Sequence, residues 1–279
     1  MQIDNQVLPE SDAQEQNGFL GSMFLSTRLR QWFQVVLVFV IFIAVWFGSV
    51  KIFDIPTYIL PAPNLLAEEL TNYQMFLRHA GVTLLEAMVG FALGGTIGFL
   101  IAVVLDYSDA LERSLMPYII AATNIPIVAF APVVVIYFGF GIESKIVVAA
   151  FISFFPMCIN TLKGLKSADV VHRDLFYSFA ASRTDLFFKL RLPSALPFIF
   201  AALRQTATAS VLAAVVAEFI QASQGLGWLI LTSAYVMDMP RLWATVVVSS
   251  VIAILFYSIV VLIERRAIPW HASVRSEDT

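Results

Sequence analysis

Six apolar runs, each long enough to cross a membrane, constrain this chain more than any other feature. A helix needs about 20 mostly apolar residues to span the hydrocarbon core of a bilayer. The runs lie between Arg30 and Lys51, at 87–105 after Glu86, between Arg113 and Glu143, between Lys145 and Lys163, from near Pro193 to about Phe219, and between Arg241 and Glu264. The sequence therefore predicts an all-α integral membrane protein with six transmembrane helices.

The composition supports this prediction. Of the 279 residues, 59% are hydrophobic and 13% are charged, and the charged share is about half that of a soluble domain. So much apolar surface cannot be hidden in one soluble core, so membrane lipid is an expected partner. The net charge of −3 offers no broad basic surface, and we expect no nucleic-acid partner.

The distribution of Lys and Arg predicts how the helices are oriented. With the N-terminus in the cytoplasm, twelve of these residues lie in cytoplasmic connections and four in external ones, with Arg204 inside a span. Basic residues are concentrated on the cytoplasmic side of membrane proteins. Both termini are therefore predicted to be cytoplasmic. We divide the chain into a flexible cytoplasmic tail (1–30), a transmembrane domain (31–266) and a second cytoplasmic tail (267–279). The start of the chain lacks the pattern of a cleaved signal peptide.

The longest predicted cytoplasmic connection, about 163–192, has an unusual pattern. Apolar residues recur every three or four positions in two short stretches, which predicts two short amphipathic helices. The sequence "SRTD" at 182–185 fits a capping box that starts the second helix near Arg183. Pro193 suits the first turn of the next span. Such a helix pair can dock in a groove of a partner protein, or it can lie against its own bundle or the lipid interface.

The same segment resembles the EAA loop of the permease subunits of ABC importers. Asp174 falls at the motif glutamate, Ala180 at its glycine, and Ala181, Ser182 and Arg183 match its Ala-Ser-Arg. Further similar stretches are "ILPAP", "IPIVAFAPVVVIYFGFGIESKI", "FFPMCINTLKGL", "LPSALPFIFAALR", "AEFIQASQGLGWLI" and "ERRAIPW". The resemblance covers nearly all of residues 34–270. It is greatest to the branch importing nitrate, sulfonates and taurine, with relatives importing pyrimidine or riboflavin-like vitamin precursors.

The resemblance implies a fold and a set of partners. The fold would be that of a type I ABC importer, with the cytoplasmic loop acting as a coupling helix. The chain would form the translocation path, as a homodimer, in a bacterial cytoplasmic (inner) membrane. ATP-binding cassette ATPase subunits would bind ATP and Mg²⁺, and a periplasmic or lipid-anchored binding protein would deliver the solute. This chain would carry no cofactor, and it contains no G-x-x-x-x-G-K-[ST] motif of its own.

The resemblance also implies which residues contact the ATPase. These coupling residues are Asp174, Phe179, Ala180, Ala181, Ser182, Arg183 and Phe187. Three departures from the motif are Leu175-Phe176 in place of Ala-Ala, Ala180 in place of glycine, and Asp174 in place of the longer glutamate. We expect the loop geometry to survive the second departure, because alanine is a good helix former.

Several polar residues and prolines lie at membrane depth. Ionisable groups there are costly and often face a cavity, so Glu86, Arg204 and Glu218 are candidates for the translocation path. The alternatives are structural pairing or snorkelling to an interface. Asn124 and Pro126, with Pro132, are predicted to break the third span, which creates either a substrate-binding kink or a packing feature.

Other patterns limit the possible functions. Gly90, Gly94 and Gly98 recur at every fourth position, which favours close helix packing within the chain over a dedicated dimer seam. The three histidines show no metal-ligand spacing, so no metal site is expected. No nucleophile–base arrangement indicates an enzyme. The remaining alternative to an importer is an ion-driven secondary transporter, which inverted repeats or buried proton relays would favour.

Overall fold

The computed structural model describes residue 30, residues 33–220 and residues 222–269, and within these residues the regular structure is helical. The chain divides into two compact units, Met1–Leu65 and Leu66–Thr279. The first unit contains the apolar helix Phe33–Ile52. The predicted tails, 1–30 and 267–279, lie almost wholly outside the described residues.

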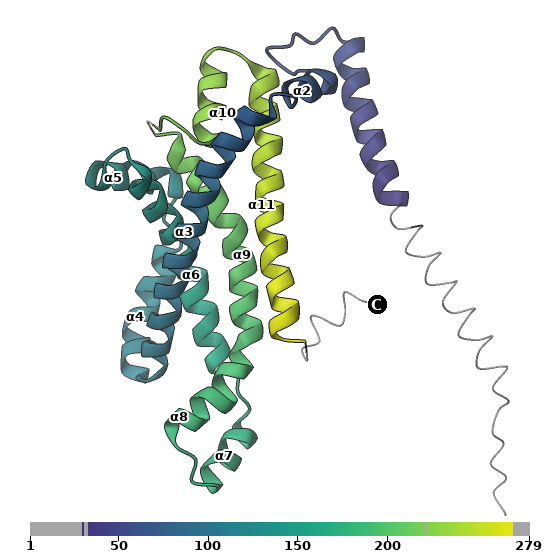
Figure 1. Ribbon diagram of the computed structural model, residues 1–279. Coiled ribbons are helices and arrows are strands. Elements are labelled where there is room, and N and C mark those ends of the chain that lie inside the picture. The colour runs from purple at the N-terminus through teal and green to yellow at the C-terminus, as the bar shows by residue number, and fades with distance from the viewer. Residues whose placement is uncertain (1–29, 31–32, 221, 270–279) are drawn as a thin grey trace, which may run out of the picture. The chain divides into compact units, whose positions relative to one another are not determined.

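The remaining helices alternate long spans with short connecting helices (Figure 1). They are α2 (Pro63–Glu69), α3 (Tyr73–Asp106), α4 (Asp109–Ala122), α5 (Ile127–Phe138), α6 (Ile142–Leu165), α7 (Val170–Ser178), α8 (Arg183–Leu186), η1 (Phe187–Arg191), α9 (Leu192–Glu218), α10 (Leu226–Tyr235) and α11 (Met239–Ala267). Five described helical segments are long and apolar enough to cross a membrane, and the bent pair α4–α5 would make a sixth. The predicted spans are thus present.

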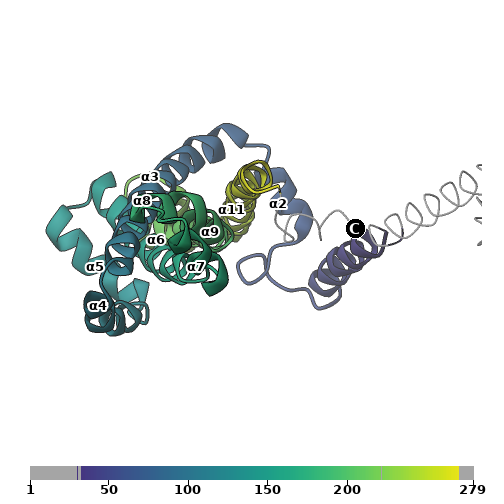
Figure 2. The same ribbon diagram turned by 90° about the horizontal axis from the view of Figure 1, so that it is seen from below.

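The core of the second unit is built around α3, α6 and α9. In the view along the bundle, α9 lies between α6 and α11 (Figure 2). The residues of α9 that face its neighbours are mostly small, including Ala202, Ala207 and Ala214, each fully buried. Small side chains let helix backbones approach closely in a membrane bundle. We call the end of the bundle that carries α7 and α8 the loop end, and the opposite end the α10 end.

The glycine repeat of α3 lies against α6. A Cβ atom added at Gly90 would lie 2.4 Å from Ala149 Cβ, and one at Gly94 would lie 2.0 Å from the carbonyl oxygen of Ala150. A Cβ atom at Gly98 would lie 2.5 Å from the Phe154 carbonyl oxygen. Real Cβ contacts of this length do not occur, so the glycines pack two helices of the same chain. This confirms the prediction of packing within the chain.

The third predicted span is broken, as expected. The helices α4 and α5 are bent by 100° to one another at Thr123–Pro126, where Pro126 has an extended backbone (φ −63°, ψ 123°). The prediction was wrong for Pro132, because α5 continues through it. Proline keeps the φ of a helix and removes only the bond to the carbonyl four residues earlier.

The predicted pair of short helices between α6 and α9 is only partly separate. The first, α7, ends before a turn at 179–182. The second is not an independent helix, because α8, η1 and α9 run on as one helical segment, Arg183–Glu218. The sequence also did not predict α10, whose ten residues are too few to span a membrane.

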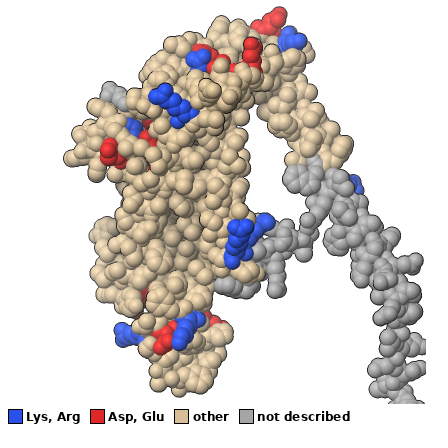
Figure 3. Space-filling view, viewed as in Figure 1, with Lys and Arg blue, Asp and Glu red and all other residues tan. Residues whose placement is uncertain are grey.

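Charge is distributed as a membrane protein requires. On the face shown in Figure 3, charged side chains gather near the ends of the bundle and leave an uncharged band between them. The long helices also expose large apolar side chains, including Leu100, Leu212 and Ile254. Exposed apolar surface of this extent is stable in lipid rather than in water.

Candidate functional site

At the loop end, α7 ends in a Schellman motif. The Ala181 N–H donates to the Phe176 carbonyl (3.1 Å) and the Ala180 N–H to the Tyr177 carbonyl (3.0 Å). Ala180 lies in the left-handed region, with φ +53°. This conformation favours glycine, which is the residue of the EAA motif at this position. The reason given for Ala180, that alanine forms helices well, was therefore wrong, because this residue lies in a left-handed turn and not in a helix.

The start of α8 is fixed by the predicted cap. The Asp185 N–H donates to Ser182 Oγ (3.1 Å), and the Ser182 hydroxyl donates to Asp185 Oδ2 (2.5 Å). Lys189 Nζ lies 2.5 Å from Asp185 Oδ1. A side chain that satisfies a free N–H of the first turn stabilises the helix by about 1 kcal/mol. The prediction that Ser182 starts the helix at Arg183 is confirmed.

The turn between α7 and α8 encloses one side of an open groove of about 630 Å³. Its lining contains four of the seven predicted coupling residues. The full lining is Leu175, Phe176, Phe179, Ala180, Ala181, Ser182, Asp185 and Lys189. Asp174 and Arg183 are exposed outside this lining. Phe187 instead packs against the buried cluster that contains Leu165 and Ala195, so it joins the loop to the bundle.

At the α10 end, Glu218 lies at the centre of a buried polar network. Its side chain is 0% exposed. Thr83 Oγ1 donates to Glu218 Oε1 (2.6 Å), and the Gly227 N–H donates to Glu218 Oε2 (2.5 Å). A carboxylate that accepts hydrogen bonds at a helix N-terminus is stabilised by them and by the helix dipole. Glu218 therefore ties the end of α9 to the start of α10.

Neighbouring amides at the start of α10 are bound by α3. The Gly225 N–H donates to His79 Nδ1 (3.1 Å), and the Leu226 N–H donates to Thr83 Oγ1 (2.8 Å). The His79 ring also stacks on the Trp228 ring, with 5.2 Å between the ring centroids. Gly225 has φ +107°, and a Cβ atom there would lie 2.1 Å from the Glu218 carboxylate. Glycine is thus required for the backbone to approach Glu218.

Two more charged residues are buried beside Glu218. Glu86 is 3% exposed and Lys145 is 2% exposed. Glu86 Oε2 has no hydrogen-bond partner, whereas Lys145 Nζ donates to the Phe140 carbonyl (2.7 Å). The structure thus brings together two of the predicted path residues, Glu86 and Glu218, on facing helices.

Arg204 is placed elsewhere. Its Nη1 lies 2.7 Å from Glu264 Oε2 on α11, and the two side chains are 28% and 3% exposed. This pair joins α9 to α11 between the buried network and the loop end. Asn124 lies at the bend between α4 and α5, where its Nδ2 donates to the Ile120 carbonyl (3.1 Å), and Pro126 follows as the N-cap of α5.

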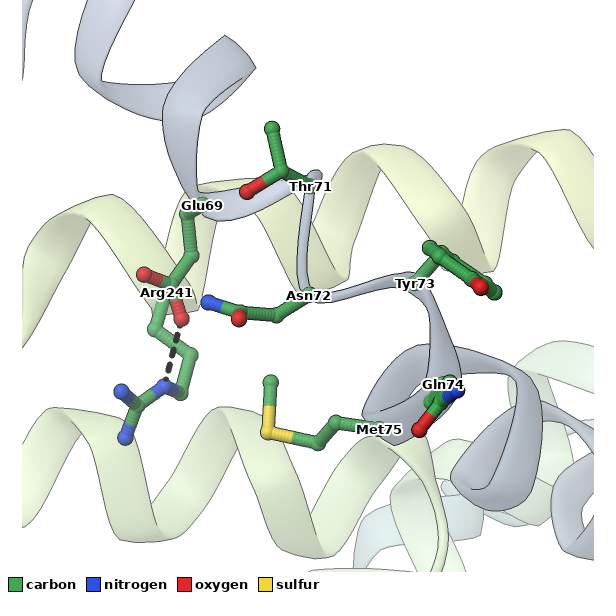
Figure 4. Close-up of a pocket in the computed structure, with 7 residues that line it drawn as sticks. All are labelled: Glu69, Thr71, Asn72, Tyr73, Gln74, Met75 and Arg241. Carbon is green, nitrogen blue, oxygen red and sulfur yellow. Dashed lines mark hydrogen bonds and ion pairs between the residues drawn. The ribbon is translucent and has the colours of Figure 1, made fainter.

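An open polar pocket of about 480 Å³ lies where α2, α3 and α11 meet at the α10 end. Figure 4 shows Glu69 and Arg241 pointing toward one another across it, and Arg241 Nε lies 2.8 Å from Glu69 Oε1. Asn72, Tyr73, Gln74 and Met75 line the rest, with Thr71. The pocket presents charged, amide and apolar groups toward solvent. Within the described ranges, no three His, Cys, Asp or Glu residues are close enough to hold a metal ion.

Sequence reasoning missed several residues of these sites. Thr83 and His79 hydrogen-bond to Glu218 and to the start of α10, Lys145 is buried nearby, and Glu264 pairs with Arg204. The sequence held a signal for Thr83, since Thr83 and Glu86 lie three residues apart on one helix face. It held no signal for the Arg204–Glu264 pair, because the pairing of residues 60 positions apart depends on how α9 and α11 pack.

Comparison with known proteins gives one family. The sequence profile of the family described as "Binding-protein-dependent transport system inner membrane component" matches residues 94–269. The formylaminopyrimidine transport permease protein ThiX of Halalkalibacterium halodurans is 31% identical over 245 residues, which cover 87% of this chain and 98% of ThiX. The riboflavin transport system permease protein RibX of Chloroflexus aurantiacus is 31% identical over 231 residues, which cover 82% of this chain and 86% of RibX.

A solved structure shares the fold. An inward-facing structure of the MetNI methionine ABC transporter aligns with a TM-score of 0.62 and 18% sequence identity, covering 70% of this chain and 97% of that one. The arrangement of α3–α11 is therefore one already seen in a membrane transporter.

Proposed function

The chain belongs to the family of binding-protein-dependent transport system inner membrane components and is a multi-pass permease subunit of an ABC importer, and from this premise we propose how its parts work. Two copies form the translocation path, two ATPase subunits bind at the loop end, and a soluble binding protein docks at the α10 end. ATP and Mg²⁺ are bound by the ATPase, and this chain holds no cofactor and performs no chemistry of its own.

The structure of the α7–α8 turn carries this proposal. It lies beyond the end of the bundle, its groove is lined mainly by apolar residues with a polar side at Ser182, Asp185 and Lys189, and α8 continues directly into the span α9. An exposed helix pair of this kind fits a groove of a partner. We propose that Asp174, Phe179, Ala180, Ala181, Ser182 and Arg183 contact the ATPase, and that Phe187 transmits its movement to the core.

Alternating access then follows from a two-state packing of the bundle. ATP-driven closure of the ATPases pulls on the loop end, and the loaded binding protein biases the α10 end. The polar pocket around Glu69 and Arg241 gives the binding protein a face with both signs of charge. We keep Asn124, Pro126, Arg204, Glu86 and Glu218 as residues of the path.

For the substrate, we propose a small solute of the kind that the relatives import. ThiX and RibX are named for formylaminopyrimidine and riboflavin, and both compounds are heteroaromatic. We therefore propose a heteroaromatic vitamin precursor as the first candidate substrate. The second candidates are nitrate, sulfonates and taurine, which the motif resemblance indicates. A transport assay in liposomes with each class, with its binding protein present, separates the two.

The proposed orientation places the loop end and both termini in the cytoplasm. Single cysteines at Ser182, Asn64 and Gln224, in a background where the buried Cys158 is alanine, test it with an impermeant thiol reagent on intact cells. We expect labelling at 64 and 224 only. Labelling of position 182 from outside would reverse the orientation and remove the ATPase contact.

The central test is co-purification of the chain with its ATPase and ATP hydrolysis in liposomes. We expect hydrolysis to rise when the loaded binding protein is added. Transport driven by an ion gradient without ATP would instead support a secondary transporter.

A further inference from the structure

The passage from α8 to α9 contains a π-helical turn, Phe187–Arg191. Here the Leu192 N–H donates to the Phe187 carbonyl, five residues back, instead of to the carbonyl four residues back. Pro193 explains the change, because it has no N–H to give to the Lys189 carbonyl. A π turn inserts one extra residue into the helix and is often found at functional sites.

A charged clamp holds the last residue of this turn. Arg191 Nη1 lies 2.7 Å from Asp106 Oδ2, and Arg191 Nη2 donates to Asp106 Oδ1 at 3.0 Å. Asp106 is the last residue of α3, and its side chain is 1% exposed, against 22% for Arg191. A two-point bond between planar groups fixes orientation as well as distance. The clamp therefore fixes the rotation of the helix at the π turn.

The segment before the π turn is held only weakly. In α7 no described residue is buried, and in α8 only Leu186 is. Among the ion pairs of the described residues, the Asp106–Arg191 clamp is the one that joins 183–191 to the rest of the bundle. A movement of α8 can therefore be transmitted to α9 only through the π turn and the clamp.

We propose that Asp106 and Arg191 are positioning residues that make α8 and α9 move as one lever during transport. With the clamp closed, a rotation of α8 turns α9 with it. With the clamp open, α8 turns about the π turn and α9 stays behind. This inference rests on the proposed docking of the ATPase at the loop end.

The test uses the complete reconstituted importer, with ATPase and binding protein. Asp106→Asn keeps the shape of the side chain and removes its charge. We expect the complex to assemble and to hydrolyse ATP, while solute imported per ATP falls about tenfold, the ratio that a bias of about 1.4 kcal/mol between two states produces. The control is Arg266→Gln, which removes an exposed charge at the end of α11 away from the clamp and should leave the ratio unchanged.

Two further variants distinguish a positioning role of the Asp106–Arg191 clamp from a role in the stability of the fold alone. Pro193→Ala restores the missing N–H without touching a charge and favours a regular helical turn, so it should leave import per ATP unchanged and should lessen the loss caused by Asp106→Asn when the two are combined. The exchanged pair Asp106→Arg with Arg191→Asp should recover part of the ratio lost in Asp106→Asn. An unchanged ratio in Asp106→Asn, or equal loss of hydrolysis and import with reduced yield, would overturn the lever. Failure of the wild-type chain to bind the ATPase would instead overturn the proposed function, so the two failures are distinguishable.

Discussion

The two ends of α9 are held to the bundle in opposite ways. At the α10 end, Glu218 is fully buried and accepts two hydrogen bonds, from Thr83 and from the start of α10. At the loop end, α9 begins after a π turn and is fixed by one partly exposed ion pair. A buried, satisfied polar network resists movement, whereas the π turn keeps its orientation only while the single Asp106–Arg191 clamp is closed. With the ATPase docked at the loop end as proposed, the α10 end is the fixed end and the loop end the driven end of the same helix.

The largest expected effect is at the fixed end. Glu218→Leu removes the acceptor for the Thr83 hydroxyl and the Gly227 N–H and leaves both donors buried without that partner. Breaking a buried charged network costs about 3–5 kcal/mol, so we expect a large drop in the thermal stability of the purified chain. Glu143→Gln, at an exposed carboxylate on α6, is the control. Equal melting temperatures for Glu218→Leu and the wild type would contradict a fixed end.

At the driven end, a backbone change should act on coupling rather than on the fold. Leu186→Pro removes the N–H that donates to the Ser182 carbonyl (3.0 Å) and costs roughly 3 kcal/mol in a helix. We expect loss of ATPase binding and of stimulated hydrolysis, with normal membrane insertion. Leu186→Ala, which keeps the helix, should retain most of the binding. Full binding and stimulation by the proline variant would show that α8 does not contact the ATPase.

Between the two ends, Arg204 tests whether the middle of α9 belongs to the path or to the scaffold. Arg204→Leu leaves Glu264 buried and unpaired, and because Arg204 is partly exposed we expect about 1–3 kcal/mol of destabilisation. The double variant Arg204→Leu with Glu264→Leu should recover that stability. Transport measured in the stable double variant decides the role: continued loss keeps Arg204 in the path, and recovery makes it structural.

The smallest effect concerns the turn that leads into the driven end. Ala180 has φ +53°, a conformation that costs a non-glycine residue about 1 kcal/mol. Ala180→Gly should therefore relieve strain in the α7–α8 turn, which slower proteolysis of the loop would reveal. Ala181→Gly, at a neighbouring position without positive φ, should not protect the loop. Faster cleavage of the loop in Ala180→Gly than in the wild type would contradict the claim that Ala180 is strained in this turn.

The fixed end was less predictable from the sequence than the driven end. The spans, the break at Asn124–Pro126 and the Ser182 cap follow from local patterns, and each is found in the structure. The role of Ala180 was not predicted, because a helix propensity does not reveal a left-handed turn. The partners of Glu218, Arg204 and Arg191 are distant in the chain, and pairing at that range depends on how helices are rotated about their own axes. Such rotations are set by packing and are not encoded in hydrophobic periodicity.

The contact between α3 and α6 limits what such a transporter can do with its helices. At Gly90, Gly94 and Gly98, one backbone lies in the space that a side chain would fill. Sliding α3 by one residue in either direction would bring larger residues into at least two of these three positions and cause a steric clash. The two helices therefore move as one rigid unit, and a force applied at one end displaces the whole pair instead of sliding one helix past the other. Opening and closing must take place where α9, α10 and the bent pair α4–α5 contact this unit.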